Sequence, residues 1–407
     1  GNESYESDGT TTRDLIFVDN AHVDDAESLM NAFADEDLVL IEVFANITTT
    51  DIIVVDKPGK SVVLDLNGYT ITANDTTTST ENGVSIGAGF LYLADGTLTV
   101  KDGTVNAIED SFRVQTEATD DYAKLILADD LTVTSQNANA VYIRALNQQE
   151  STTPNAVLET AADLKVSGKY AAIQGNGTST DGPVSVTVTG GDIVADPADE
   201  TIDGTGLYLP GRGEYLITGG TITAPTGVEF RAGTLTITGG TITATGEFAA
   251  DPNGNGATTS GVAVAMMQHT TERDLTLNIT GGEFNGAYAV YQQNIQNNDS
   301  GTLTMSLTGG TFNGNVDSEN CTEYISGGQY SVKPAAEAFK PGFDGVEYDG
   351  YYVVIETTTD DIAALLAARI DAQADVRTYA AVLGIDWKAM EALADTDDVA
   401  AAALDAY

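Results

Sequence analysis

A short motif of alternating residues that ends in a glycine pair recurs along the chain, and it restricts the fold more than any other feature. Clear copies are LTITGGTIT at 235–243, LNITGGEF at 277–284 and LTMSLTGGTF at 303–312. The period of two places Leu235, Ile237 and Ile242 on one face and threonines on the other. The glycine pair supplies a bend that a β-branched residue would resist. One such unit cannot bury its apolar face alone, whereas stacked parallel copies can.

The repeat therefore predicts an all-β fold, a single-stranded parallel β-helix, forming a right-handed solenoid of about ten coils over residues 21–356. Alternating apolar residues should point into its core: Leu64, Leu66, Val100, Val133, Val166, Val188, Ile217, Ile237, Ile279 and Leu307. A second short strand follows each glycine turn, at 112–115, 141–144, 171–174, 207–210, 228–231, 262–264 and 290–293. Polar loops at 115–122, 146–155, 174–183, 268–274 and 292–301 are expected at one point of the coil.

The two ends of the chain differ from the repeats. We expect residues 1–20 to be a flexible N-terminal segment. Residues 24–33 read as a short amphipathic helix with an acidic start, which could lie as a cap over the first coil. Residues 357–407 are rich in Ala, Leu and Asp and predict a small C-terminal helical module. The chain starts at Gly1 rather than Met, as expected of a chain whose leader has been removed.

Composition narrows the possible partners. The net charge of −44 repels nucleic acid phosphates and anionic lipid head groups, so neither is an expected partner. No apolar run reaches the roughly 18 residues that a membrane span needs. The single cysteine, Cys321, excludes an intramolecular disulfide and reads as a small packed side chain. No cofactor is predicted, although adventitious calcium between acidic loops fits the charge, and the oligomeric state stays open.

Two segments carry a resemblance to a known group of proteins. VLDLNGYTIT at 63–72 resembles the first coil of β-helical cell-surface proteins from gut bacteria, which share the pectate-lyase-like fold. ISGGQYSV at 325–332, followed by YDGYYV at 348–353, resembles their closing coil. The resemblance covers roughly residues 20–355 and implies a secreted or cell-surface protein.

The same fold also houses pectin-cleaving enzymes, so an enzyme is the main alternative. The sequence lacks the Asn-Thr-Asp and Gly-His-Gly elements of polygalacturonases, and no motif selects an acid pair or a calcium-binding cluster. A zinc site is not expected from two histidines and one cysteine. Ice binding is a third class, but the Thr-x-Thr array is interrupted at residues such as Glu283 and Asn285.

Basic and aromatic side chains recur on the outward face of the second strands. Arginine offers forked donors for carboxylate or sulfate, and tyrosine offers a face for sugar rings. The predicted ligand-binding residues are Arg113, Tyr142, Arg144, Gln174, Tyr208, Arg212, Arg231, Tyr291 and Gln293. The competing interpretation is ordinary strand surface with acidic neighbours such as Glu229. We expect a non-catalytic adhesion or glycan-binding protein whose partner is a polysaccharide or a host or bacterial surface glycan. The alternative is a polysaccharide lyase or glycoside hydrolase.

Overall fold

Parallel β-strands dominate the computed structural model of the chain. It describes residues 4–5, 13–14, 19–81, 83–196, 204–251, 256–269, 273–296, 301–348 and 350–357. These residues contain one α-helix, one short 3-10 helix, and otherwise strands and turns. The chain divides into two units, Gly1–Asp192 and Ile193–Tyr407.

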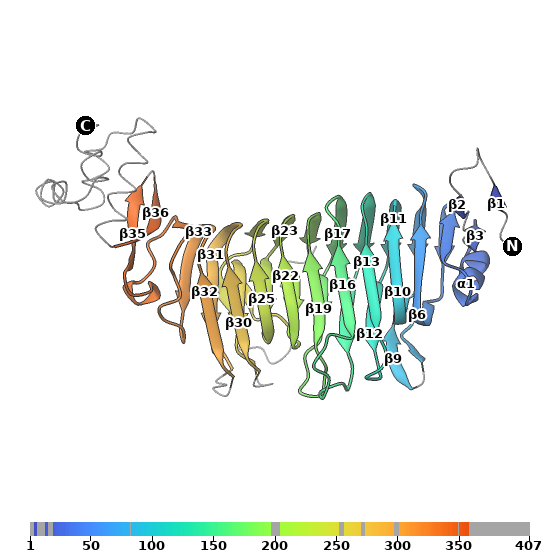
Figure 1. The fold of residues 1–407 in the computed structure, drawn as a ribbon, viewed down its shortest axis with the longest axis horizontal. Coiled ribbons are helices and arrows are strands. Elements are labelled where there is room, and N and C mark those ends of the chain that lie inside the picture. Colours follow the sequence, from blue (N-terminus) through green and yellow to red (C-terminus); the bar gives the residue numbers. More distant parts are fainter. Residues whose placement is uncertain are drawn as a thin grey trace, which may run out of the picture. The chain divides into compact units, whose positions relative to one another are not determined.

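The first unit repeats a coil of three short strands. Strands β13, β14 and β15 form one coil, and β16, β17 and β18 form the next, each strand in parallel register with its equivalent. Leu125 lies opposite Leu158, and Val133 lies opposite Val166. Figure 1 shows β13 and β16 side by side. The arrangement fits a parallel β-helix, and the prediction of parallel pairing is confirmed.

The strands of the first unit have the following bounds. They are β1 (Ser4–Tyr5), β2 (Arg13–Asp14), β3 (Asn20–Val23), β4 (Leu40–Val43), β5 (Ile47–Thr49), β6 (Ile53–Asp65), β7 (Thr70–Ala73), β8 (Ser79–Glu81), β9 (Val84–Gly87), β10 (Gly89–Lys101), β11 (Gly103–Ala107), β12 (Asp110–Thr116), β13 (Ala123–Leu127), β14 (Leu131–Ser135), β15 (Asn139–Ala145), β16 (Ala156–Thr160), β17 (Leu164–Gly168), β18 (Ala171–Gly175) and β19 (Val184–Val188). The boundary between the units falls within β20 (Asp192–Ala195).

Helix α1 (Ala26–Ala34) forms where the sequence predicts a helix. Asp25 is its N-cap and accepts a hydrogen bond from the backbone N–H of Ser28, whose hydroxyl accepts one from the Asp25 N–H. This capping box satisfies two backbone donors that would otherwise lack partners. Leu29 and Phe33 are buried, because they share one face of the helix.

The second unit repeats the same kind of coil. Strands β22, β25, β30 and β32 pair in parallel, as do β23, β26, β31 and β33. Its strands are β21 (Thr205–Leu209), β22 (Gly213–Ile217), β23 (Thr221–Ala224), β24 (Thr226–Phe230), β25 (Gly233–Ile237), β26 (Thr241–Ala244), β27 (Ala249–Ala250), β28 (Thr259–Ser260), β29 (Val262–Met267), β30 (Leu275–Ile279), β31 (Glu283–Gln293), β32 (Leu303–Leu307), β33 (Thr311–Ser318), β34 (Gln329–Tyr330), β35 (Phe343–Tyr348) and β36 (Tyr351–Glu356), with the 3-10 helix η1 at Ala336–Ala338.

The core of each unit consists of the side chains that alternation predicts to point inward. All ten predicted core positions, from Leu64 to Leu307, are buried to 1% exposure or less. In the second unit, aromatic rings add a stack behind the glycine turns. The rings of Phe284 and Phe312 have centroids 5.0 Å apart, and those of Phe312 and Tyr330 are 4.5 Å apart. Their interplanar angles of 13° and 7° make a nearly parallel stack.

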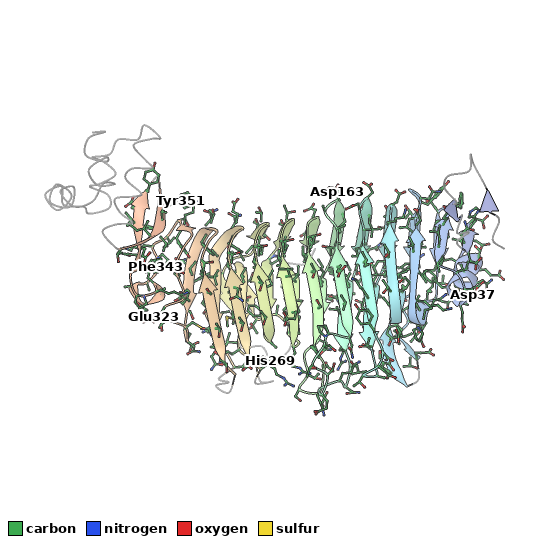
Figure 2. The ribbon with its side chains drawn as sticks, viewed as in Figure 1. Asp37, Asp163, His269, Glu323, Phe343 and Tyr351 are labelled. Atoms are coloured by element: carbon green, nitrogen blue, oxygen red, sulfur yellow. The ribbon has the colours of Figure 1, made fainter. Side chains whose placement is uncertain are left out.

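The second unit ends in antiparallel pairing. Strand β36 pairs antiparallel with both β34 and β35, which changes the strand direction after the last parallel coil. Tyr351 lies on β36 (Figure 2), and its hydroxyl donates a hydrogen bond of 3.0 Å to Oδ1 of Asn313. The predicted C-terminal helical module lies outside the described residues, apart from residue 357.

Long polar loops leave the coil at one recurring position. In the first unit they occupy 117–122, 146–155 and 176–183, and follow β12, β15 and β18, which are equivalent strands. In the second unit a loop follows β29, where Figure 2 shows His269, and another follows β31. The strands before and after each loop keep their register with the neighbouring coils. The loops can therefore differ in length and sequence without changing how the strands pair.

Candidate functional site

The nine predicted ligand-binding residues are divided between the two units. Arg113, Tyr142, Arg144 and Gln174 lie in the first unit, on β12, β15 and β18. The second unit holds Tyr208, Arg212, Arg231, Tyr291 and Gln293, on or directly after β21, β24 and β31.

In the first unit, three of these side chains form a ladder across neighbouring strands. Arg113 lies opposite Tyr142, which lies opposite Gln174. The Arg113 guanidinium carbon is 4.0 Å from the centroid of the Tyr142 ring, within the range of a cation–π interaction. The Tyr142 hydroxyl accepts a hydrogen bond of 2.8 Å from Nδ2 of Asn176. The ladder is packed against its own neighbours, and Tyr142 is only 7% exposed.

Arg113 and Arg144, the two predicted arginines of the first unit, each hold a buried carboxylate. Nη2 of Arg113 donates to Oδ2 of Asp110 at 3.2 Å, and Asn139 donates to the other oxygen. Burial raises the pKa of the Asp110 carboxyl, and the Arg113 cation opposes this rise. Arg144 binds Asp181 through two parallel hydrogen bonds of 2.9 and 3.1 Å. Because Asp181 belongs to the loop after β18, Arg144 ties that loop to the coil.

In the second unit, Arg231 and Glu229 form an ion pair whose side chains are both 0% exposed. Nε of Arg231 donates to Oε1 of Glu229 at 3.0 Å, and Nη2 donates to the carbonyl of Gly256 at 2.7 Å. The same carboxylate accepts hydrogen bonds of 2.8–3.0 Å from the backbone N–H and hydroxyl of both Thr258 and Thr259. The pair therefore fastens the segment before β29 to strand β24.

These ion pairs bear on the role of the arginines. A guanidinium that already holds a buried carboxylate would have to release it before binding a ligand carboxylate, which leaves an uncompensated buried charge. Tyr208 is 8% exposed, and its ring centroid lies 5.4 Å from the Arg231 guanidinium carbon. The contacts of Arg113, Arg144 and Arg231 thus favour a structural role. Two further members of the predicted set, Tyr291 and Gln293, are partly exposed and lie close together on β31.

Tyr291 belongs to a group of three aromatic rings, here called the aromatic cluster: Phe248, Tyr288 and Tyr291. The Phe248 centroid lies 4.3 Å from that of Tyr288 and 5.4 Å from that of Tyr291, and the two tyrosine rings are 4.9 Å apart. Phe248 is 40% exposed, and both tyrosines are partly exposed. The Tyr291 hydroxyl donates to Oε1 of Gln293 at 2.9 Å. The rings of the aromatic cluster, with the side-chain amide of Gln293 beside Tyr291, are thus partly open to solvent.

The strands and one glycine hold the aromatic cluster in place. The tyrosines pack on the buried side chains of Val262, Ala265 and Met267. Phe248 precedes β27, which pairs antiparallel with β28 in a short hairpin. Gly261 has φ of +73°, and a Cβ atom there would lie 2.7 Å from the backbone nitrogen of Phe248. Only glycine permits this close approach of the hairpin to the coil.

Carboxylates surround the aromatic cluster. Asp317 on β33 lies opposite Tyr291 on β31, and both side chains point outward because their neighbours Val290 and Val316 are buried. Asp317 and Glu319 are exposed. Burial, followed by the nearby Tyr288, Asp317 and Glu319, raises the pKa of the Tyr291 phenol. The phenol therefore remains neutral at physiological pH and keeps its hydrogen for donation.

Phe248 and Tyr288 were not among the predicted site residues. Phe248 stands in a polar segment, Thr-Gly-Glu-Phe, where an isolated aromatic residue is the only signal. Tyr288 is close to Tyr291 in the sequence YAVY, although only the fold shows that both rings meet Phe248.

The second unit also has an open groove at the glycine turns, with a volume of about 520 Å³. Its lining residues are Gly281, Gly282, Gly310, Thr311, Gly328, Gln329, Val353 and Val354. The carbonyls of Gly282, Gly310 and Gly328 already accept hydrogen bonds from the next coil or from β36. The groove therefore offers less ligand-binding chemistry than the aromatic cluster.

Three further observations concern metals, membranes and the thiol. Within the described ranges, no group of three or more His, Cys, Asp or Glu side chains is placed to hold a metal ion. The helix in this part of the chain is too short and polar to cross a bilayer. Cys321 is a free, half-buried cysteine, and burial raises the pKa of its thiol.

No protein-family model matches the chain, and comparison with curated proteins and with solved structures finds no significant similarity. Function must therefore be argued from the geometry of the aromatic cluster.

Proposed function

We propose that the protein binds glycans without catalysing a reaction, and that the aromatic cluster is its binding site. The observation that carries this proposal is the exposed ring of Phe248 in contact with two partly exposed tyrosines. Sugar rings present apolar C–H faces, which lose contact with water when they stack on an aromatic ring. Gln293 and the tyrosine hydroxyls supply the hydrogen-bonding groups that orient a sugar.

The proposal also covers where the protein acts and how its coil is built. The resemblance to β-helical surface proteins of gut bacteria favours adhesion at the cell surface or in the surrounding medium. It also favours a right-handed coil with α1 closing its N-terminal end, as the buried Leu29 and Phe33 suggest. An adhesin needs only to hold its ligand, and the aromatic cluster offers contact surface without a pair of opposed acids.

The test compares two matched phenylalanines. The parent protein, Phe248→Ala and Phe44→Ala are screened on a glycan array, and affinities are measured by calorimetry for the glycans retained. Phe44 is the control because it is 44% exposed, close to the 40% of Phe248, and lies in the other unit. We expect at least about a tenfold loss for Phe248→Ala, which is about 1.4 kcal/mol, and none for Phe44→Ala.

Two results would contradict the proposal. The first is that the parent protein retains no glycan, and the second is that Phe248→Ala binds as tightly as the parent. Release of reducing sugar, measured in the same samples, tests the alternative of a polysaccharide-degrading enzyme.

A further inference from the structure

The aromatic cluster lies in a part of the chain without basic side chains. The sequence contains no lysine, arginine or histidine between Arg231 and His269, and none between Arg273 and Lys333. Phe248, Tyr288 and Tyr291 all fall within these two stretches. Any cation near the aromatic cluster must therefore come from elsewhere in the fold.

Acidic side chains occur in the same stretches. Glu247 is exposed and precedes Phe248 directly. Asp317 and Glu319 are exposed on the side of Tyr291, and Asp317 sits on the neighbouring strand, about 4.8 Å away across the sheet. A ligand that stacks on the aromatic cluster thus meets carboxylates at its edge.

We infer that the glycan bound by the aromatic cluster carries free ammonium groups, as in an oligomer of glucosamine. This inference rests on the proposed function and names its ligand class. An ammonium group gains from both features of the site, because carboxylates attract it and the faces of aromatic rings attract cations. A uronic acid or sulfated sugar would meet the like charges of Glu247, Asp317 and Glu319, in a protein whose net charge is already −44.

This inference reverses the ligand charge that the sequence suggested. The expectation of an acidic glycan depended on arginines with free guanidinium groups. Arg113, Arg144 and Arg231 instead pair with Asp110, Asp181 and Glu229. The aromatic cluster lies beside the carboxylates of Glu247, Asp317 and Glu319, so the favoured ligand changes from anion to cation.

The test uses three oligosaccharides of equal length. These are a glucosamine oligomer, its N-acetylated counterpart and a galacturonate oligomer, measured by calorimetry at about pH 6, where sugar amines are protonated and carboxylates are ionised. The first two share a backbone and differ only in charge and the acetyl group. We expect the glucosamine oligomer to bind at least about tenfold more tightly than the other two at low salt. The preference should shrink at 1 M NaCl, where the Debye length falls to about 3 Å.

The variants separate charge from stacking. Asp317→Asn with Glu319→Gln keeps an acceptor oxygen at each position, including the one that accepts the Asn294 N–H. It should weaken binding of the glucosamine oligomer about tenfold and leave any binding of the N-acetylated oligomer unchanged. Glu214→Gln is the control for the loss of a negative charge away from the carboxylates beside Tyr291. Glu214 is exposed on β22, which is separated from β30 by one strand, β25. This variant should change neither affinity.

Each contrary result has a distinct meaning. If the N-acetylated or galacturonate oligomer binds as tightly as the glucosamine oligomer, or if the double variant binds like the parent, the inference is wrong. The proposed function then still stands, provided that Phe248→Ala weakens the binding at least about tenfold. If none of the three oligomers binds, the inference is overturned, and the glycan screen decides separately whether the proposed function fails.

Discussion

Replacing Arg231 by methionine should reveal whether this residue is structural. Methionine retains much of the buried volume of arginine but removes the charge and the hydrogen bonds to Glu229 and the Gly256 carbonyl. The Glu229 carboxylate would keep its donors from Thr258 and Thr259 and lose the Arg231 cation. Removing one partner of a fully buried ion pair costs about 3–5 kcal/mol. We expect Arg231→Met to lower the free energy of unfolding by that amount.

The assay is urea unfolding followed by circular dichroism, since urea is uncharged and does not screen the net charge of −44. Lys333→Met is the matched control, because it removes one positive charge from an exposed pair with Asp344, whose side chains are 45% and 49% exposed. It should cost less than about 1 kcal/mol. A double variant, Glu229→Gln with Arg231→Met, removes both charges and should cost less than the sum of its single variants.

One result would refute this reasoning. If Arg231→Met unfolds at the same urea concentration as Lys333→Met, the buried pair does not stabilise the second unit. A loss of glycan binding by Arg231→Met without any loss of stability would instead assign Arg231 to the ligand.

Two further predictions concern glycine turns and pH. Gly68→Ala should cost about 1–2 kcal/mol in unfolding free energy, because φ is +79° and the space around it is open. Gly103→Ala should cost more, since its Cβ would lie 2.4 Å from that of Leu66; equal urea midpoints for the two variants would contradict this. Burial, aided by the Arg231 cation, lowers the pKa of His269 to about 4. Between about pH 6.5 and 4, His269 therefore binds a proton in the unfolded chain but not in the folded chain. Because of this difference, the free energy of unfolding falls as the pH falls through this range. His269→Gln should make the urea midpoint less dependent on pH between about 6.5 and 5, and an unchanged slope would count against this assignment.

The repeat predicts the coil well because its signal is local. Ile237 and Leu277 are buried where period two places them, and the glycine pairs occur at the turns between strands. The alternation of apolar and polar residues also places Arg231 on the outward face of the coil, outside its core. It does not predict that Thr258 and Thr259 cover that face, because their position depends on how a polar segment folds back.

The candidate site is less predictable for the same reason. Tyr291 and Gln293 follow from the pattern of β31, whereas Phe248 reaches them from a hairpin on the preceding coil. The partners of Arg144 show the same limit, because Asp181 is in a loop one coil further on. Contacts between a strand and a loop depend on the conformation of the loop. The spacing of hydrophobic residues along the strands carries no information about that conformation.

The loops after β12, β15 and β18 leave the first unit at equivalent positions, and this has a consequence for how such a protein can diversify. The strands on either side keep their register whatever the loop length, and the entropy of closing a loop grows slowly with its length. Neighbouring loops emerge about 4.8 Å apart along the stack and hydrogen-bond to one another: Asn155 donates to the Thr119 carbonyl, and the Asn147 N–H donates to Asp181. The first unit therefore presents a row of joined loops over a constant core, so an insertion in one loop would change a surface that its neighbouring loops share.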